Sequence, residues 1–152
     1  MNILRCTEEQ IAHALTAIRV IKHEEDNIPL ELITEDAMCQ FLSDPNNYLV
    51  VAVENDEVLG YVVAYALQRV DREAKTLFFY EIGVSKQARK RGIGTALINF
   101  MKDVCETNNY MKMWVPTERS NNAAMQLYEK TGGTISESID EVSFTWYPPY
   151  NV

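Results

Sequence analysis

Three β-strand patterns follow one another between residues 48 and 84, with no helical pattern between them. The first two, 48–54 (YLVVAVE) and 58–69 (VLGYVVAYALQR), are joined by the turn NDE, and 75–84 (KTLFFYEIGV) completes an antiparallel meander. A helical pattern that ends near Asn108 and a strand pattern at 110–115 (YMKMWV) come next. Such a strand–helix–strand crossover makes its two strands parallel. The chain is therefore predicted to form one mixed, twisted α/β sheet.

Two helices are predicted before the meander, and one more after the crossover. Thr7 and Gln10 have the spacing of a capping box that starts the first helix, and Thr34 caps the second. Ser120 or Asn121 caps the last helix. These polar residues are typical of helix starts because their side chains satisfy the first free amides.

Strand patterns also open and close the chain, at 2–6 (NILRC), 133–138 (GTISES) and 141–147 (EVSFTWY). The predicted order of elements is βααβββαβαββ. It describes a single domain over residues 1–152, an α/β (α+β) fold in which helices flank a mostly antiparallel sheet.

The charges of the chain are unevenly distributed. Its net charge is −8, yet residues 85–102 hold five bases and no acid, while residues 1–58 hold twelve acids and three bases. An acidic protein is a poor partner for nucleic acid, whose phosphate backbone needs an extended basic face. One compact basic patch suits one small polyanion instead.

Membrane insertion, disulfides and metal binding are not expected. The apolar runs are short and broken by charges, and the N-terminal stretch MNILRCTEEQ lacks a signal-like core, so the protein is expected in the cytoplasm. The three cysteines, Cys6, Cys39 and Cys105, are an odd number at wide spacing. This pattern favours buried thiols over a disulfide framework or a zinc site.

Gly92 and Gly94 lie at the start of the predicted crossover helix, directly after the basic run 89–91. Glycine inside a helix costs about 1 kcal/mol relative to alanine, so its presence here needs a physical reason. The first amides of a helix are unpaired and lie at the positive end of the helix dipole, where they bind anions. A glycine lets a phosphate approach them closely. The alternative is a helix start on a solvated basic surface.

Two motifs in this chain resemble those of one enzyme family. The stretch RKRGIG (89–94) resembles the pyrophosphate loop, Arg/Gln-x-x-Gly-x-Gly/Ala, of the GNAT superfamily of acyl-CoA-dependent N-acetyltransferases, and NNAAMQLYEKTGG (121–133) resembles the family's N-x-x-A-x-x-L-Y-E-K-x-G segment. The predicted strand order also agrees with the family fold over nearly the whole chain. One departure is Gly133, where the family usually has phenylalanine, and it should change packing more than chemistry.

The resemblance implies that acetyl-CoA is the co-substrate, with no metal. Backbone amides of the loop would hold its pyrophosphate, and a strand edge would pair with its pantetheine arm. The residues that the resemblance assigns to acetyl-CoA are Ile82, Val84, Arg89, Lys90, Arg91, Gly92, Ile93, Gly94, Thr95 and Asn121.

Tyr128 is the candidate general acid. It matches the family tyrosine near the CoA sulfur, which can give a proton to the leaving thiolate. The alternative is a half-buried helix tyrosine with a packing role. A backbone N–H at Val84 is expected to stabilise the oxyanion of the reaction.

Glu81 is a lone carboxylate in an apolar strand, where an acid is usually avoided. It is a candidate base that takes the proton of an ammonium substrate, directly or through water. Strand alternation puts it on the face opposite Tyr80 and Ile82, so pairing with Arg69 or Arg72 on the surface is the alternative. The nearby Gly83 marks either a strand bulge or close packing beneath an aromatic ring.

The expected acceptor is a small molecule with a primary amine and a positive charge. The acidic run Glu24, Glu25 and Asp26 could attract such a cation, together with Glu81, although an acidic run is often a solvated loop. The pair Tyr80–Glu81 and the following helix start resemble aminoglycoside 3-N-acetyltransferases of the gentamicin-resistance type. Those enzymes have aspartate at the position of Glu81 and a different loop at 115–122 (VPTERSNN), so an aminoglycoside is one candidate acceptor.

Three other functions fit the same sequence. They are acetylation of a peptide or protein amine, CoA binding without turnover, and protein interaction through the closing strand. The closing segment 142–150 (VSFTWYPPY) is aromatic and ends in prolines, so it would suit a homodimer or simply end the sheet.

Overall fold

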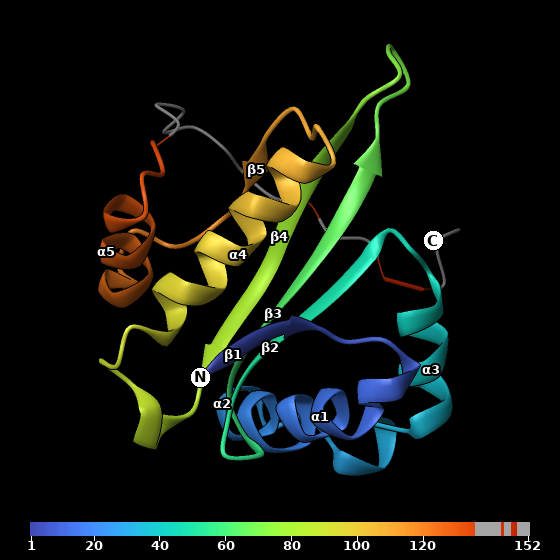
Figure 1. Cartoon of the computed structure of the whole chain (residues 1–152), viewed down its shortest axis with the longest axis vertical. Helices are drawn as coiled ribbons and strands as arrows, with labels where there is room; N and C mark the ends of the chain where they lie inside the picture. The colour runs from blue at the N-terminus through green and yellow to red at the C-terminus, as the bar shows by residue number, and fades with distance from the viewer. Residues whose placement is uncertain (136–143, 145–146, 149–152) are drawn as a thin grey trace.

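The sheet is the centre of the molecule (Figure 1). The structure, a computed structural model, describes residues 1–135, 144, 147 and 148. Five strands lie in the order in which they occur in the chain, antiparallel from the first to the fourth, with the fifth parallel to the fourth: β1 (Asn2–Arg5), β2 (Asn47–Glu54), β3 (Glu57–Gln68), β4 (Lys75–Val84) and β5 (Met113–Trp114). The predicted mixed sheet is confirmed.

Most residues after 135 lie outside the described part of the chain. No strand begins among residues 133–135, and the rest of the strand predicted at 133–138 lies outside the described residues. The same holds for nearly all of the strand predicted at 141–147 and for the proposed edge at 142–150. The homodimer proposal therefore stays a prediction.

Helices cover both faces of the sheet. On one face lie a long helical run and a second helix: η1 (Glu8–Gln10), α1 (Ile11–Thr16), the π-helical η2 (Ala17–Lys22), α2 (His23–Asp26), the short η3 (Leu30–Leu32) and α3 (Glu35–Ser43). The short η4 (Lys86–Ala88) follows the meander, and α4 (Ile93–Thr107) and α5 (Asn122–Lys130) cover the other face. Within the described residues, no helix is both long and apolar enough to cross a membrane.

Three polar residues start these helices as the sequence predicts. Thr7 and Gln10 form the capping box, with the Thr7 amide donating to Gln10 Oε1 at 3.0 Å. Thr34 Oγ1 accepts from the Ala37 amide at 3.1 Å, and Asn121 caps α5 in the same way. Each cap stabilises its helix by about 1 kcal/mol.

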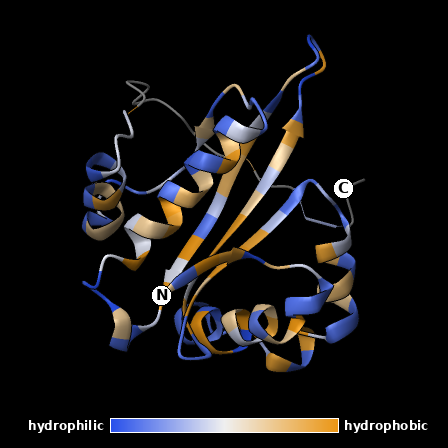
Figure 2. Ribbon diagram, in the orientation of Figure 1, coloured by the Kyte–Doolittle hydropathy of each residue, from blue (hydrophilic) through white to orange (hydrophobic). Residues whose placement is uncertain are grey.

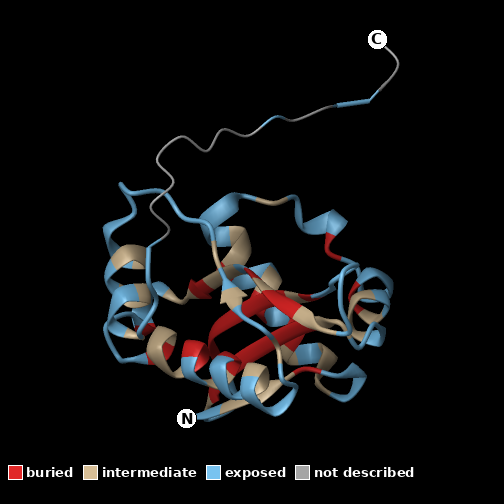
Figure 3. Ribbon diagram, turned by 90° about the horizontal axis from the view of Figure 1, so that it is seen from above, coloured by how far each residue is buried: buried red, intermediate tan, exposed pale blue. Residues whose placement is uncertain are grey.

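A hydrophobic core lies on each side of the sheet, because side chains alternate along the strands. Val50 and Ala52 share a core with residues of α4, whereas Val51 and Val53 share a core with residues of α1 and α3. Both sets are buried, which explains the almost continuous apolar runs of the meander. Figure 2 shows these strands in orange, and Figure 3 shows the buried residues gathered at the centre.

The three cysteines are free thiols. Burial raises the pKa of Cys6 to about 12 and that of Cys105 to about 11. Both thiols therefore stay protonated at neutral pH, the form that does not react as a nucleophile. Cys39 and Cys105 are only partly buried, so the predicted burial is complete for Cys6 alone.

A bulge interrupts β4 at Tyr80. Val63 of β3 pairs with Glu81 and its neighbour Ala64 pairs with Phe79, so Tyr80 is an extra residue without a partner. The exposed Tyr80 ring lies 5.7 Å from the ring of Tyr65, which packs against the core next to α1 and α3. Glu81 projects to this same face. The predicted alternation, with Tyr80 and Glu81 on opposite faces, is therefore wrong, because the extra residue shifts the strand by one position.

β4 and β5 separate soon after they meet. Their pairing is limited to Leu77 with Met113 and Phe78 with Trp114. Beyond Phe78, the edge of β4 that faces β5 has no strand partner among the described residues. We call this opening the β4–β5 split. Backbone groups on such an edge are available to pair with an extended ligand.

Gly83 provides room for a ring and does not form the bulge. A Cβ atom at Gly83 would lie 2.4 Å from Cε1 of Tyr61, which is buried on β3. The expectation that Gly83 marks a bulge is wrong, since the bulge lies three residues earlier. The alternative, close packing beneath an aromatic ring, is confirmed.

Replacing Gly83 with alanine should destabilise the fold by about 1–3 kcal/mol, because the new methyl group overlaps the Tyr61 ring. Urea unfolding followed by circular dichroism measures this loss. In the double variant Gly83→Ala/Tyr61→Leu the overlap is gone. Its loss in the free energy of unfolding should therefore be smaller than the sum of the losses in the two single variants. Fully additive losses would contradict the contact.

Candidate active site

Side chains from both faces of β4 converge on the β4–β5 split. Ile82 and Val84 pack in the core next to α4, and Tyr128 of α5 belongs to the same core. Glu81 lies on the opposite face, beside Lys22 of η2. A ligand that enters the split would therefore contact groups from both layers of helices.

The start of α4 has the properties of an anion site. Gly92 precedes the first helical residue with φ of +79°, and no side chain caps the helix. A Cβ atom at Gly92 would meet no other atom within 4 Å, so the space above the first amides is open. The left-handed conformation favours glycine here. The unpaired amides and the helix dipole therefore face open space, as the sequence predicts for Gly92 to Thr95.

Gly94 has a further role, which sequence reasoning missed. A Cβ atom there would lie 2.9 Å from Cδ2 of Leu127, so the missing side chain lets α4 approach α5 closely. Asn121 likewise has a structural task, because its Oδ1 accepts the hydrogen bond from the Ala124 amide at 3.1 Å. The assignment of these residues to acetyl-CoA stays a prediction.

Carboxylates already pair with most bases of this loop. Arg89 binds Glu25 at 2.9 Å, and Lys86 lies 4.0 Å from Glu24. Arg91 binds Glu54, and this hydrogen bond lowers the pKa of the Glu54 carboxyl group. These pairs are largely exposed, so each adds little to stability and exchanges readily with solvent or a ligand.

Lys90 is different from its basic neighbours. Among the residues that the structure describes, it has no ion-pair partner, and its side chain is exposed. Its φ of +62° is unusual for a residue with a side chain. The loop therefore presents one free cation at the open start of α4.

The acidic run Glu24, Glu25 and Asp26 forms α2 and faces bases of this same chain. Glu24 and Glu25 bind the loop that follows β4, as described above, and Asp26 binds Lys22 at 2.8 Å. The run therefore connects η2 and α2 to the loop before α4. Its expected role in attracting a cationic acceptor stays a prediction, but its charge is mostly compensated within the protein.

Glu81 pairs with Lys22, and not with either arginine considered from the sequence. Both side chains are largely buried, with 20% of Glu81 and 18% of Lys22 exposed. The buried Tyr61 phenol also lies close enough for the charge of Glu81 to raise its pKa, in addition to the larger effect of burial. Arg69 and Arg72 bind Asp71 at the far end of the hairpin instead. No local pattern in the sequence signals Lys22, because its approach depends on the π-helical turn.

Lys22 remains charged in this environment. Burial lowers its pKa, but hydrogen bonds to Asp26 and Glu81 outweigh that effect, so that its pKa is raised above the usual value. Burial also raises the pKa of Tyr61, with Glu81 as a further cause. The cluster therefore combines the charged Lys22 ammonium group and the protonated Tyr61 phenol with the acidic side chains of Asp26 and Glu81.

Tyr128, the candidate general acid, packs against β4. Its ring lies edge-on to Phe79 of β4, with the centroids 6.2 Å apart, and its hydroxyl has no hydrogen-bond partner among the described residues. Burial raises its pKa, so the hydroxyl stays protonated at neutral pH. A protonated, unpaired hydroxyl suits a general acid, and the assignment of Tyr128 as catalytic stays a prediction.

A row of aromatic rings borders the split on the face of Glu81. The rings of Phe78 and Trp114 stack with centroids 4.4 Å apart, and Tyr80 lies edge-on to Phe78 at 5.7 Å. Trp114 is 42% exposed and Tyr80 is 51% exposed. The split therefore has an apolar wall next to a charged cluster.

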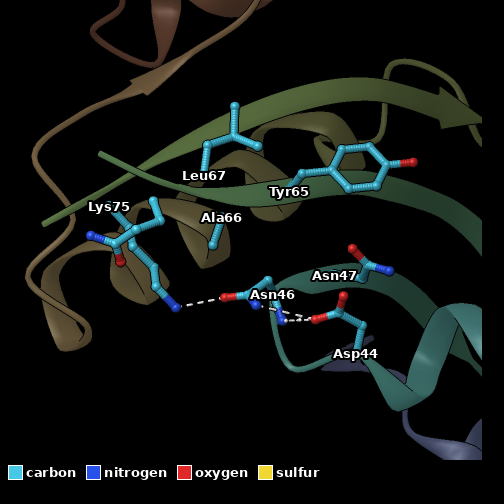
Figure 4. A pocket seen from close by; sticks show the side chains of 8 residues that line it. Asp44, Asn46, Asn47, Tyr65, Ala66, Leu67 and Lys75 are labelled. Carbon is cyan, nitrogen blue, oxygen red and sulfur yellow. Dashed lines mark hydrogen bonds between the residues drawn. The ribbon is translucent and has the colours of Figure 1, made fainter. Parts of the chain in front are cut away.

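Two cavities among the described residues differ in what lines them. One, of about 580 Å³, lies at the end of β4 remote from Val84 and contains none of the predicted site residues (Figure 4). Two hydrogen bonds connect residues that line it. The Lys75 ammonium group donates to Asn46 Oδ1 at 2.6 Å, and the Asn46 backbone amide donates to Asp44 Oδ1 at 2.9 Å. The other, of about 570 Å³, lies between η2 and the loop after β4 and is lined by residues that include Ile21, Glu24, Ser85 and Gln87.

Comparison with known proteins gives one family. Residues 12–133 match the sequence pattern of the acetyltransferase (GNAT) family. The chain is 32% identical to L-2,4-diaminobutyric acid acetyltransferase of Marinococcus halophilus over 115 residues, which are 70% of this chain and 62% of that protein. It is 34% identical to the ribosomal protein bS18 alanine N-acetyltransferase of Salmonella typhimurium over 92 residues, 60% of this chain and 59% of that protein. The chain thus spans about half to three fifths of the length of these curated relatives.

Solved structures share its fold. An aminoglycoside acetyltransferase from an uncultured soil metagenomic sample, in complex with trehalose, superposes with a TM-score of 0.84 at 20% identity, over 96% of each chain. The aminoglycoside N-acetyltransferase AAC(6')-Iy in complex with CoA superposes with a TM-score of 0.77 at 15% identity, over 97% of this chain and 94% of that one. At this identity the likeness concerns the fold alone.

Proposed function

The chain belongs to the acetyltransferase (GNAT) family, and on that basis we propose that it transfers the acetyl group of acetyl-CoA to a primary amine of a small acceptor. The observation that carries the proposal is the meeting of three features at the β4–β5 split. They are the open start of α4 at Gly92, the unpaired edge of β4 and the protonated hydroxyl of Tyr128.

The residues present fit acetyl-CoA. Its pyrophosphate needs several donors and no obstructing side chain, and the open amides after Gly92 provide both. Lys90 adds a free positive charge, and Arg89 can exchange Glu25 for a phosphate group. The edge of β4 at Ile82 and Val84 offers backbone groups to the amides of the pantetheine arm.

The reaction needs few groups. The acceptor ammonium loses a proton, and its nitrogen then forms a bond to the thioester carbon. The carbon–sulfur bond breaks, and the sulfur leaves with the electron pair and takes a proton from Tyr128. The nitrogen gives up its second proton to solvent as the amide forms, and a proton from solvent restores the Tyr128 hydroxyl. Glu81 is the candidate for the first proton, directly or through a bound water, and the Val84 amide is the candidate donor to the oxyanion.

The charges of the run 24–26 bear on which acceptor can bind. A polycation such as an aminoglycoside would meet the run 24–26, whose carboxylates are paired with Lys22, Lys86 and Arg89. It would have to displace these bases in order to bind. An aminoglycoside is therefore one candidate, beside the amino-acid and protein amines named for the relatives.

The variant Gly92→Ala tests the cofactor loop. Its methyl group would hold the pyrophosphate away from the amides, so acetyl-CoA affinity should fall by about tenfold or more, which is about 1.4 kcal/mol. Isothermal titration calorimetry measures the affinity. Gly132→Ala is the matched control, because Gly132 also has a positive φ and open space for a Cβ atom, yet lies after α5. Equal affinities in both variants would refute the loop assignment.

Tyr128→Phe tests the general acid. The ring remains and only the hydroxyl is lost, so kcat should fall by about 10- to 1,000-fold while acetyl-CoA affinity is unchanged. Release of free CoA, followed with a thiol reagent, measures kcat. Tyr110→Phe is the control, because its hydroxyl also lies in a part-buried region but pairs with Tyr48 at 2.7 Å. Full activity of Tyr128→Phe would give this residue a packing role.

A further inference from the structure

The ion pair between Lys22 and Glu81 is the feature that the proposed reaction leaves unexplained. Its members lie far apart in the chain, on η2 and on β4, and both are largely buried. Taking two charges out of water costs free energy that their attraction often does not recover. A pair of this kind beside an opening is therefore a poor device for stability alone and a candidate for ligand binding.

Three local irregularities bring this pair to the split. The π-helical turn η2 delivers Lys22, and such turns are frequent at functional sites. The bulge at Tyr80 turns Glu81 to the face of η2, since regular alternation would point it toward α4. Gly83 makes room for the ring of Tyr61, whose phenol lies within the electrostatic reach of Glu81. Each irregularity carries a cost, and together they build one cluster.

The charge of this cluster limits what can bind. Lys22 is shared by Glu81 and Asp26, so the three groups sum to one negative charge. The other charges around it, Glu24 and Glu25, are bound to bases of the loop before α4. An acceptor with one surplus positive charge would balance the cluster.

We infer that Lys22 and Glu81 together bind an acceptor that is a diamino acid, with Lys22 holding its carboxylate and Glu81 holding the ammonium group that becomes acetylated. The inference rests on the proposed acetyl transfer and names its substrate class. Such a molecule carries two ammonium groups and one carboxylate, which gives the required single positive charge. On binding, it replaces the contact between Lys22 and Glu81 with one contact to each, while Asp26 keeps Lys22 in position.

Two further observations agree with this acceptor. The aromatic wall formed by Tyr80 and its neighbours lies on the same face as Glu81 and offers apolar surface to a short carbon chain. The chain is also similar to an enzyme named for L-2,4-diaminobutyric acid, which has two amines and one carboxylate. A diamine without a carboxylate, or a peptide N-terminus without a nearby one, separates Glu81 from Lys22 and gives Lys22 no new partner beside Asp26, so it should bind less well.

The test compares each diamino acid with the diamine that lacks only its carboxylate. The pairs are 2,4-diaminobutyrate with 1,3-diaminopropane, ornithine with putrescine, and lysine with cadaverine, each assayed with acetyl-CoA by release of free CoA. The wild-type protein should prefer the best diamino acid over its partner by about 10- to 100-fold in kcat/KM, the range expected for one charge-assisted contact. In Lys22→Met this ratio should fall to about 1.

The controls separate recognition from folding. Lys22→Arg keeps the charge and should keep most of the preference for the diamino acid over its diamine. Lys112→Met removes an exposed lysine on the loop before β5 and should leave that preference unchanged. Each ratio comes from one preparation of one variant, so a loss of folded protein cancels. Asp26→Asn should lower kcat/KM for the diamino acid more than for its diamine, because Lys22, which holds the carboxylate, is then less well positioned.

Several outcomes would overturn the inference. These are a ratio that is unchanged in Lys22→Met, a wild-type preference for the diamines, and faster acetylation of an aminoglycoside or a peptide amine than of every diamino acid. If the wild-type protein binds acetyl-CoA but acetylates no amine, the proposed function fails separately. Calorimetry with 2,4-diaminobutyrate and 1,3-diaminopropane on the CoA-saturated protein then still decides the role of Lys22.

Discussion

Tyr80 is the residue of β4 that has no partner on β3, and the layout of the site depends on it. With regular pairing, Glu81 would project into the apolar layer beneath α4, where an unpaired carboxylate is costly. The extra residue turns Glu81 to the face of η2, where Lys22 pairs with it. It also lies next to the last pair between β4 and β5, at Phe78 and Trp114. The charged cluster and the β4–β5 split are therefore adjacent.

Ion pairs connect the acceptor side of the proposed site to the loop that is expected to bind the pyrophosphate. Asp26 holds Lys22 beside the expected acceptor, while Glu25, one residue before it, holds Arg89 beside the expected pyrophosphate. An anion that binds the loop would compete with Glu25 for Arg89. Because Glu25 and Asp26 lie on the same short helix, occupation of the loop and the position of Lys22 are physically linked.

The sequence predicted what depends on local pattern. The strand meander, the parallel crossover, the caps at Thr34 and Asn121 and the glycine at the start of α4 all follow from neighbouring residues. The bulge at Tyr80 was not predicted. The sequence of β4 fits a regular two-residue alternation, and the extra residue is recognised only from the pairing of β4 with β3. Lys22 was missed because a π-helical turn leaves no mark in hydrophobic periodicity. The partners of the run 24–26 and the contact between Gly94 and Leu127 depend on tertiary packing, which no local pattern contains.

The central claim is that acetyl-CoA binds in the β4–β5 split and at the start of α4. Backbone amide signals, followed by NMR while CoA is added to the labelled protein, test it most directly. The account predicts that the amides of Gly92 to Thr95 and of Ile82 to Val84 shift, and that those lining the remote cavity, at Asn46 and Asn47, do not. Shifts confined to the remote cavity, with the amides of Gly92 to Thr95 unchanged at saturating CoA, would contradict it.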